Sequence, residues 1–226
     1  MLVSVPGLLS AQEVQTVRTH LSGAPWADGR LTAGYRSAAV KANLQLPQAD
    51  PAAQQASGIV VRALERSATF ISATLPHHVF PPLFNRYESG MAFGAHVDNA
   101  VRLIPGTPHR LRTDISATLF LSAPGDYDGG ELIVADLYGS HSLKLAAGDL
   151  VVYPASSLHQ VEPVTRGVRE AAFFWIQSMV RDDGARTLLY DVDTSIRDLT
   201  SRGADAAALL RLTGCYHNLL RRWAEL

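Results

Sequence analysis

Residues 114–122 read DISATLFLS, and residues 168–179 read VREAAFFWIQSM. Both segments are rich in the β-branched and aromatic residues that favour strands. Shorter runs of the same character lie around them, at residues 83–88, 131–135, 142–145 and 150–153. Turn residues separate these runs, as at Gly125–Gly130. Many short strands with turns between them predict a β-sandwich or barrel at the centre of the chain.

The two ends of the chain have helical patterns instead. Ser10 followed by Glu13 is a capping box, and Asp50 followed by Pro51 is an N-cap with proline at the first helical position. The second of these helices is expected to run to about Thr74. From about residue 181 onward, two stripes of apolar residues recur at helical spacing. We therefore expect one β domain with N-terminal helices over residues 1–180 and a helical appendage over residues 181–226.

Residues 39–46 alternate between apolar and polar side chains, which is typical of a half-buried strand. One face carries the apolar residues Val40, Ala42, Leu44 and Leu46, and the other carries Lys41, Asn43 and Gln45. The polar side chains would line the mouth of a binding site or lie in solvent. The pattern alone favours the solvated face.

Composition excludes several classes of protein. Hydrophobic residues make up 47% of the chain and charged residues 18%, as expected of a globular protein with a core. The net charge of −1 provides no strong field for nucleic acid or an acidic membrane. We see no signal peptide and no membrane span. The single cysteine, Cys215, cannot form an internal disulfide. A cytoplasmic protein that binds neither nucleic acid nor membrane is the expectation.

The chemistry is expected at a His-x-Asp pair in the β region. Residues i and i+2 of a strand point to the same side, so His96 and Asp98 would present two ligands together. His159 follows a strand that ends at Pro154 and is the best candidate for a third ligand. Two histidines and one carboxylate on one face of a metal form the site of non-haem iron(II) oxygenases. Such a site leaves positions open for an oxidant and a chelating co-substrate.

An arginine accompanies this ligand set. Arg169 lies ten residues after His159 at the start of an apolar strand, on the face shared by Ala171 and Phe173. A cation at that position would be buried and would need an anionic partner. A dicarboxylate co-substrate would match the guanidinium fork. The alternative is a surface arginine paired with Glu170 or Glu162.

Several motifs together resemble the prolyl 4-hydroxylase-like 2-oxoglutarate oxygenases. Asn85-Arg86-Tyr87 and the stretch from His96 to Ala100 carry this resemblance. The resemblance to the bacterial PKHD-type hydroxylase branch is closer and covers nearly the whole chain. It rests on four further stretches: RTDISATLFL at 112–121, DYDGGEL at 126–132, the run from Tyr153 to Val161, and QSMVRD at 177–182.

The resemblance implies an α+β fold in which helices flank a double-stranded β-helix, or jelly-roll. It implies iron(II) at His96, Asp98 and His159, and 2-oxoglutarate at Arg169. Dioxygen would be the second co-substrate, and ascorbate would sustain activity. Tyr87 is a further candidate for binding the co-substrate carboxylate. The resemblance also suggests a link to iron and siderophore metabolism.

Other functions use parts of the same pattern. A cupin-type jelly-roll, as a metalloenzyme or a binding module, would have the metal ligands but no need of Arg169. Nucleic-acid demethylation would use the same cofactors, but the chain lacks a stretch that combines basic and aromatic residues. The sequence does not identify the primary substrate, which is a small molecule or a peptide. The C-terminal apolar stripes suit a homo-oligomer interface as well as an intramolecular cap.

Overall fold

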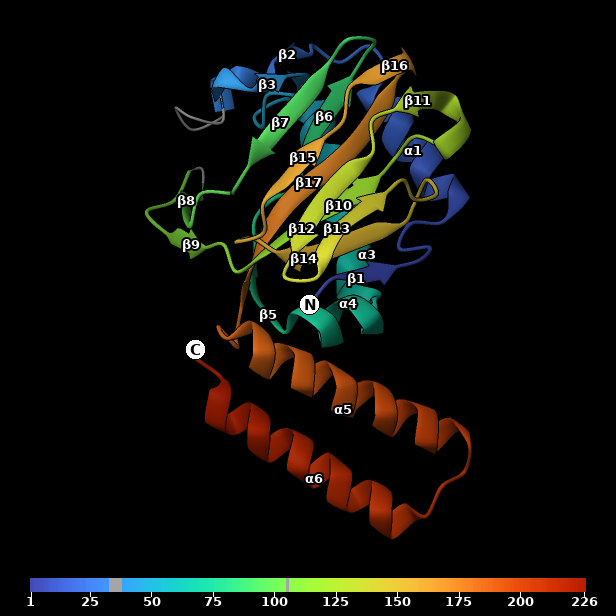
Figure 1. Cartoon of the computed structure of the whole chain (residues 1–226), viewed down its shortest axis with the longest axis vertical. Coiled ribbons are helices and arrows are strands. Elements are labelled where there is room, and N and C mark those ends of the chain that lie inside the picture. Colours follow the sequence, from blue (N-terminus) through green and yellow to red (C-terminus); the bar gives the residue numbers. More distant parts are fainter. Residues whose placement is uncertain (33–37, 105) are drawn as a thin grey trace.

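The structure is a computed structural model that describes residues 1–32, 38–104 and 106–226. It is a mixed helix-and-sheet protein in which every strand pairing among these residues is antiparallel. Figure 1 shows the strands gathered in one body, with a pair of long helices beneath it. The central β region and the helical ends are therefore arranged as the sequence predicts.

The larger sheet contains eight strands within the described residues. Seven of them follow the order β1 (Val3–Val5), β14 (Leu150–Pro154), β10 (Ile115–Phe120), β17 (Arg169–Ser178), β6 (Leu83–Tyr87), β4 (Leu44–Gln45) and β2 (Ala27–Asp28). The eighth, β5 (Pro76–Val79), pairs with the end of β17. The two segments singled out first in the sequence, β10 and β17, are neighbours at the centre of this sheet.

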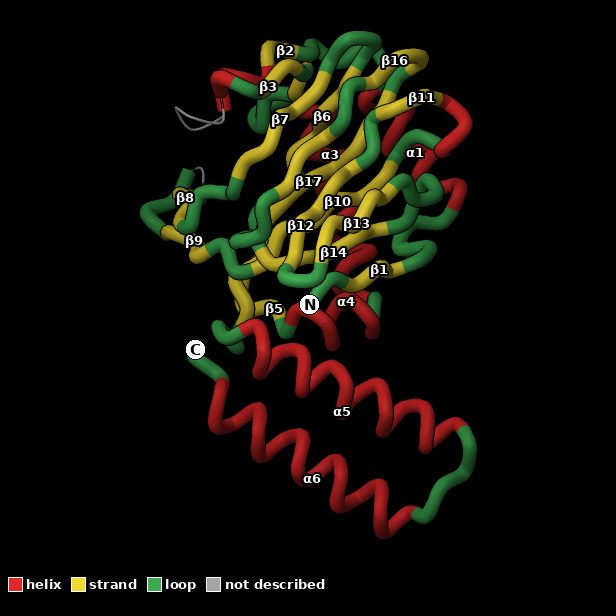
Figure 2. The backbone as a smooth tube through the Cα atoms, viewed as in Figure 1, coloured by secondary structure: helices red, strands yellow, loops and turns green. Residues whose placement is uncertain are grey.

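The smaller sheet lies in front of the larger one in Figure 2, and two short ribbons stand beside it. Its strand order is β13 (Gly139–Leu143), β12 (Leu132–Asp136), β15 (His159–Val161), β7 (Ala92–His96) and β3 (Lys41–Ala42). The ribbons are β11 (Tyr127–Gly129) with β16 (Val164–Gly167), and β8 (Val101–Leu103) with β9 (Arg110–Arg112).

Helices cover the outer face of the larger sheet. They are α1 (Ala11–Leu21), α3 (Pro51–Arg66) and α4 (Ala68–Thr74). The main apolar core lies between these helices and strands β10, β14 and β17. One long helix was expected from Asp50 to Thr74, but it is divided at Ser67. The Ser67 hydroxyl accepts a hydrogen bond from the Phe70 N–H and so caps a new helix.

A second apolar cluster lies between the two sheets. It includes Tyr87 and Phe120 from the larger sheet and Leu132, Val134 and Val161 from the smaller one. Alternation along β17 sends Phe174 into the helix-covered core and leaves Arg169 and Phe173 on the face toward the second sheet. The space between the sheets is therefore where polar side chains of the interior collect.

The C-terminal segment forms two antiparallel helices, α5 (Asp183–Ser201) and α6 (Ala206–Trp223). Helix α5 contacts α4, and its buried Leu189 packs with Leu75 and Val180 in a small separate cluster. Trp223 of α6 closes the same cluster. Within the described residues, no helix combines the length and the apolar character needed to cross a membrane.

Candidate active site

Two neighbouring strands of the smaller sheet bring three metal-ligand side chains together. Strand β7 ends at His96, and β15 begins at His159 directly opposite it. Asp98 follows His96 by two residues, and its Oδ2 lies 3.6 Å from Nε2 of His159. One ligand atom from each of the three side chains lies within 4.8 Å of the others. The His-x-Asp pair and the distant histidine of the sequence therefore meet at one point.

Hydrogen bonds to the backbone orient both imidazole rings. Nδ1 of His96 lies 2.8 Å from the Gly94 carbonyl, and Nδ1 of His159 lies 3.0 Å from the Ser157 carbonyl. Since a carbonyl oxygen only accepts, each Nδ1 must carry the hydrogen. The lone pair is then on Nε2, as a metal ligand requires.

The carboxylate is oriented in the same way. The Ser116 hydroxyl donates to Oδ2 of Asp98 at 2.6 Å, from strand β10 of the opposite sheet. This contact ties the ligand to a fully buried strand and leaves Oδ1 outside the hydrogen bond. Ser116 was not expected from the sequence. It is, however, a polar residue in an otherwise mostly apolar run, on the same strand face as Thr118, and that pattern is a usable signal.

Burial favours the neutral form of the His96 imidazole, which is the form that binds a metal cation. Desolvation, together with the neighbouring ring of His159, lowers the pKa of His96 to about 4. The imidazole of His96 is therefore neutral at pH 7 and able to donate its lone pair to a metal. The Tyr153 ring packs 5.2 Å from that of His159, and burial raises the pKa of its hydroxyl.

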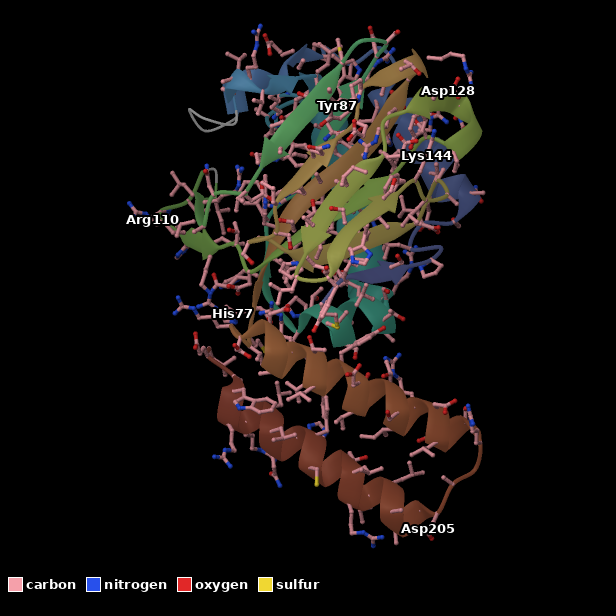
Figure 3. All side chains as sticks on the ribbon, in the orientation of Figure 1. His77, Tyr87, Arg110, Asp128, Lys144 and Asp205 are labelled. Carbon is pink, nitrogen blue, oxygen red and sulfur yellow. The ribbon has the colours of Figure 1, made fainter. Side chains whose placement is uncertain are left out.

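Arg169 lies in the same cavity as a buried cation. It is 1% exposed, and its three side-chain nitrogens make no hydrogen bond to any described residue. Its guanidinium carbon lies 5.3 Å from the centre of the Tyr87 ring and 5.4 Å from that of Phe120. Tyr87 stands directly opposite Arg169 in the β6–β17 pairing, and Figure 3 shows it among the strands. An unpaired buried cation is costly, so this position is suited to an anionic ligand.

The surface pairing considered for Arg169 does not occur. Glu170 points to the other side of β17, where it pairs with Arg18 at 3.5 Å and Arg86 at 3.6 Å. Glu162 accepts a hydrogen bond from Gln160. In the described part of the chain, neither carboxylate forms an ion pair with Arg169.

One cavity connects the three ligand side chains with Arg169. It encloses about 790 Å³, its open mouth included. Side chains of both sheets line it, among them Asn85, Tyr87, Thr118, Leu132 and Phe173. A chamber with a three-donor cluster on one wall and a bare guanidinium on another can hold a metal together with a small dianion.

The solvated face expected for residues 39–46 is wrong. Lys41, Asn43 and Gln45 are buried, and Lys41 and Asn43 line the cavity, whereas Val40 is exposed. Leu46 is buried as well, but from Val40 to Gln45 the strand alternates with its polar side chains facing inward. It is also broken into β3 and β4, which belong to different sheets. The polar side chains point inward because the interior they face is the cavity rather than an apolar core.

Comparison with known proteins identifies the family. Residues 82–177 match the 2OG-Fe(II) oxygenase superfamily, and residues 183–225 match the PKHD-type hydroxylase C-terminal domain. A PKHD-type hydroxylase of Saccharophagus degradans is 56% identical over 225 residues, which cover all of both chains. The chain belongs to the PKHD-type hydroxylases. It is accordingly an Fe(II)- and 2-oxoglutarate-dependent dioxygenase.

Solved structures share the fold of this hydroxylase. A prolyl 4-hydroxylase of Pseudomonas putida superposes with a TM-score of 0.53 at 20% identity, over 78% of this chain and 92% of that one. A prolyl hydroxylase of Trichoplax adhaerens, in complex with a hypoxia-inducible-factor peptide, gives 0.56 at 15% identity. That match covers 77% of this chain and 82% of the other.

The cavity of the hydroxylase fits both groups that its family requires. Two imidazoles and a carboxylate suit iron(II). The dry guanidinium of Arg169 suits the distal carboxylate of 2-oxoglutarate. A cupin-type protein without 2-oxoglutarate would leave that guanidinium with no function, so the fit agrees with the family and not with the cupin alternative.

Proposed function

We propose that His96, Asp98 and His159 hold the iron of this hydroxylase, and that Arg169 with Tyr87 holds the distal carboxylate of 2-oxoglutarate. The observation that carries the proposal is the bare guanidinium of Arg169, buried in the same cavity as the three-donor cluster. A structural arginine would have a protein partner at this depth.

The bound iron and co-substrate, with dioxygen, supply an oxidant that hydroxylates a C–H bond while 2-oxoglutarate becomes succinate and carbon dioxide. The protein positions these groups. The Gly94 and Ser157 carbonyls hold the two imidazoles in the ligating tautomer, and Ser116 holds the carboxylate. Arg169 neutralises one end of the co-substrate, and the rings of Tyr87 and Phe120 keep water from that ion pair.

An anaerobic titration tests the assignment. Iron(II) is added to the apo-protein, then 2-oxoglutarate, and the visible charge-transfer band between them is recorded. The band is expected in the wild type, absent in His159→Ala, and shifted to higher 2-oxoglutarate concentrations in Arg169→Ala. His141→Ala is the matched control, because His141 lies exposed on β13 of the same sheet.

A wild-type level of the band in His159→Ala would remove that residue from the ligand set. An unchanged 2-oxoglutarate requirement in Arg169→Ala would refute the anchoring role. No band in folded, iron-loaded wild type would refute the whole arrangement.

The finer architecture belongs to the same proposal. The two facing antiparallel sheets form the double-stranded β-helix of the oxygenases, over residues 1–180 together with the N-terminal helices. Residues 181–226 form the helical appendage. The two separate family matches, at 82–177 and 183–225, support this division, as does the separate apolar cluster around Leu189.

The primary substrate is a small molecule or a peptide with a C–H bond at the open side of the iron. The Trichoplax prolyl hydroxylase was solved in complex with a peptide. The cavity of the present chain is open to solvent on one side and could admit either kind of substrate. The use of ascorbate, the link to siderophores, the cytoplasmic location and a homo-oligomer stay predictions.

A further inference from the structure

The cavity contains two cations that neither iron nor 2-oxoglutarate requires. Lys41 comes from β3 at the edge of the smaller sheet, and Arg102 comes from β8 in the hairpin that follows Asp98. Both side chains line the same cavity as the iron ligands and Arg169. Among the described residues that line the cavity, the charged side chains other than histidine are Asp98, Arg169, Lys41 and Arg102.

Arg102 is held against an aromatic wall. Its guanidinium carbon lies 3.4 Å from the centre of the Trp175 ring and 6.0 Å from that of Phe80. Its Nε is buried and has no hydrogen-bond partner among residues 1–32, 38–104 and 106–226. Stacking on a ring fixes the plane of the guanidinium but does not satisfy its N–H donors. The group is therefore positioned to bind an acceptor.

Lys41 is held in the same region. It is 6% exposed, and its Nζ donates to the side-chain oxygen of Gln45 at 3.0 Å. The same nitrogen lies 5.3 Å from the centre of the Phe93 ring and 5.8 Å from that of Phe173. Burial and then the charge of Arg102 lower the pKa of the Lys41 ammonium to about 8. The Phe173 ring near Lys41 lies 5.6 Å from the Trp175 ring that stacks with Arg102, so the two cations lie against adjacent rings of one aromatic wall.

The formal charges of the site with iron and 2-oxoglutarate bound indicate which kind of group Lys41 and Arg102 could bind. Iron(II), the 2-oxoglutarate dianion, Asp98 and Arg169 sum to zero formal charge when both histidines are neutral. Among the described residues of the cavity, Lys41 and Arg102 add two further positive charges, which lie against aromatic rings. Repulsion between them and the cost of their desolvation would both be relieved by an anion.

We propose that Lys41 and Arg102 together bind a carboxylate on the primary substrate, whose apolar part lies against Phe93, Phe173 and Trp175. This inference rests on the proposed function, because it assigns the substrate class of the same cavity. The substrate is therefore an acid, and the C–H bond to be hydroxylated lies between its carboxylate and the iron.

The test uses anaerobic protein loaded with iron(II) and saturating 2-oxoglutarate, so that Arg169 is already occupied. Calorimetry measures binding of a panel of carboxylic acids, from propionate to 3-phenylpropionate and 3-(2-naphthyl)propionate, each beside its primary amide. The acids are expected to bind about tenfold more tightly than the amides, since a charge-assisted hydrogen bond is lost in each amide. The larger aromatic acids are expected to bind best.

The variants Lys41→Met and Arg102→Met should each weaken acid binding about tenfold and leave amide binding unchanged. Arg102→Lys, which keeps the charge, should lose less. Arg110→Met is the matched control: Arg110 lies on the other strand of the same hairpin and is exposed, and Figure 3 shows it at the outer edge of the molecule.

The charge-transfer band, recorded on every sample, separates this inference from the proposed function. If the wild type gives a normal band, three results would overturn the substrate assignment alone. The protein binds acids and amides equally, it binds no acid, or the variants bind acids as the wild type does. No band in the wild type, with acids still bound through Lys41 and Arg102, would refute the proposed iron and co-substrate site and leave the anion site standing.

Discussion

Arg169 is a buried cation whose proposed role in binding 2-oxoglutarate has a consequence for stability. The guanidinium is buried between two aromatic rings without a hydrogen-bond acceptor from the described chain. The two rings offset only part of the desolvation cost of the charge. The remainder is recovered when an anion binds, so the co-substrate should stabilise the fold as well as react.

Thermal unfolding with and without 2-oxoglutarate measures this effect. At about 100 times its dissociation constant, a ligand that binds only the folded state stabilises it by about 2.7 kcal/mol. For a chain of this size we expect a rise in Tm of roughly 5–10 °C in the wild type. In Arg169→Met the rise should be small at the same concentration. An equal rise in both proteins would show that the dianion is bound elsewhere.

Ser116 should affect the iron without touching it. Its hydroxyl holds Oδ2 of Asp98, and loss of such an outer contact typically weakens metal binding by about 10- to 100-fold. We expect this loss in Ser116→Ala, measured by competition with a chelator. Ser122→Ala is the control, since Ser122 is also buried but bonds the backbone of Val168 and Glu170. A similar loss of iron affinity in both variants would indicate general destabilisation instead.

At this scale the sequence identifies the four residues that meet in the cavity better than it identifies their surroundings. His96, Asp98, His159 and Arg169 were singled out from strand alternation and spacing, and the structure gathers all four in one cavity. Arg102 was missed, because no spacing rule indicates that a residue of a loop hairpin will return to the cavity.

At the scale of secondary-structure elements, the turn before β12 is constrained because it packs closely against Arg169. Gly130, in the turn before β12, has a φ of +68°. A Cβ there would lie 3.0 Å from Cδ of Arg169 and 2.9 Å from Cγ2 of Val164. Gly129 and Gly130 looked like a simple tight turn in the sequence. In the structure, the absence of a side chain at Gly130 leaves room for the side chain of Arg169.

Gly130→Ala should therefore affect both stability and co-substrate binding. The positive φ alone costs on the order of 1–3 kcal/mol for a residue with a side chain, and displacement of Arg169 should raise the dissociation constant of 2-oxoglutarate. Gly125→Ala is the control, because its Cβ would meet nothing within 4 Å. Chemical unfolding and the charge-transfer titration measure the two effects. Unchanged 2-oxoglutarate binding in Gly130→Ala would show that the turn does not position the arginine.

The strands show what alternation can and cannot predict. The runs at β10 and β17 were recognised because they are rich in β-branched and aromatic residues, which favour strands. At residues 40–45 alternation separates two faces but does not indicate which one is inside. The rule that apolar residues face inward fails there, because this part of the interior is a polar chamber.

On the scale of the whole molecule, the apolar interior is divided. The helix-covered cluster, the cluster between the sheets and the cluster around Leu189 share no buried residue. The last of these joins the C-terminal helices to the rest through Leu75 and Val180. Changes in it should alter stability without reaching the cavity.

Two adjacent leucines of α5 test this separation. Leu189 is fully buried, whereas Leu188 is 56% exposed. Leu189→Ala should lower the free energy of unfolding by about 2–5 kcal/mol, and Leu188→Ala should change it by less than about 0.5 kcal/mol. Both proteins, folded below their transition, should give the wild-type charge-transfer titration. A weakened titration in Leu189→Ala would show that the C-terminal helices and the iron site are coupled.

Sequence patterns predict the layout of these parts, from the central strands to the terminal helices. They do not predict how the parts meet. The apolar stripe of α5 contains the buried Leu189 and the exposed Leu188, whereas no residue of α6 is buried, and helical spacing does not indicate these differences. Only packing against α4 and Val180 decides which side is covered.

The hairpin that carries Arg102 has a consequence for how such enzymes diverge. Strands β8 and β9 pair with each other and with no other strand of the described chain. The hairpin is closed at its base by the hydrogen bond from the Thr113 N–H to the Ala100 carbonyl. Loops anchored in this way tolerate replacement and changes of length. Descendants of one ancestral hydroxylase can therefore exchange this hairpin and acquire new substrates, while the strands that carry His96 and His159 are inherited unaltered.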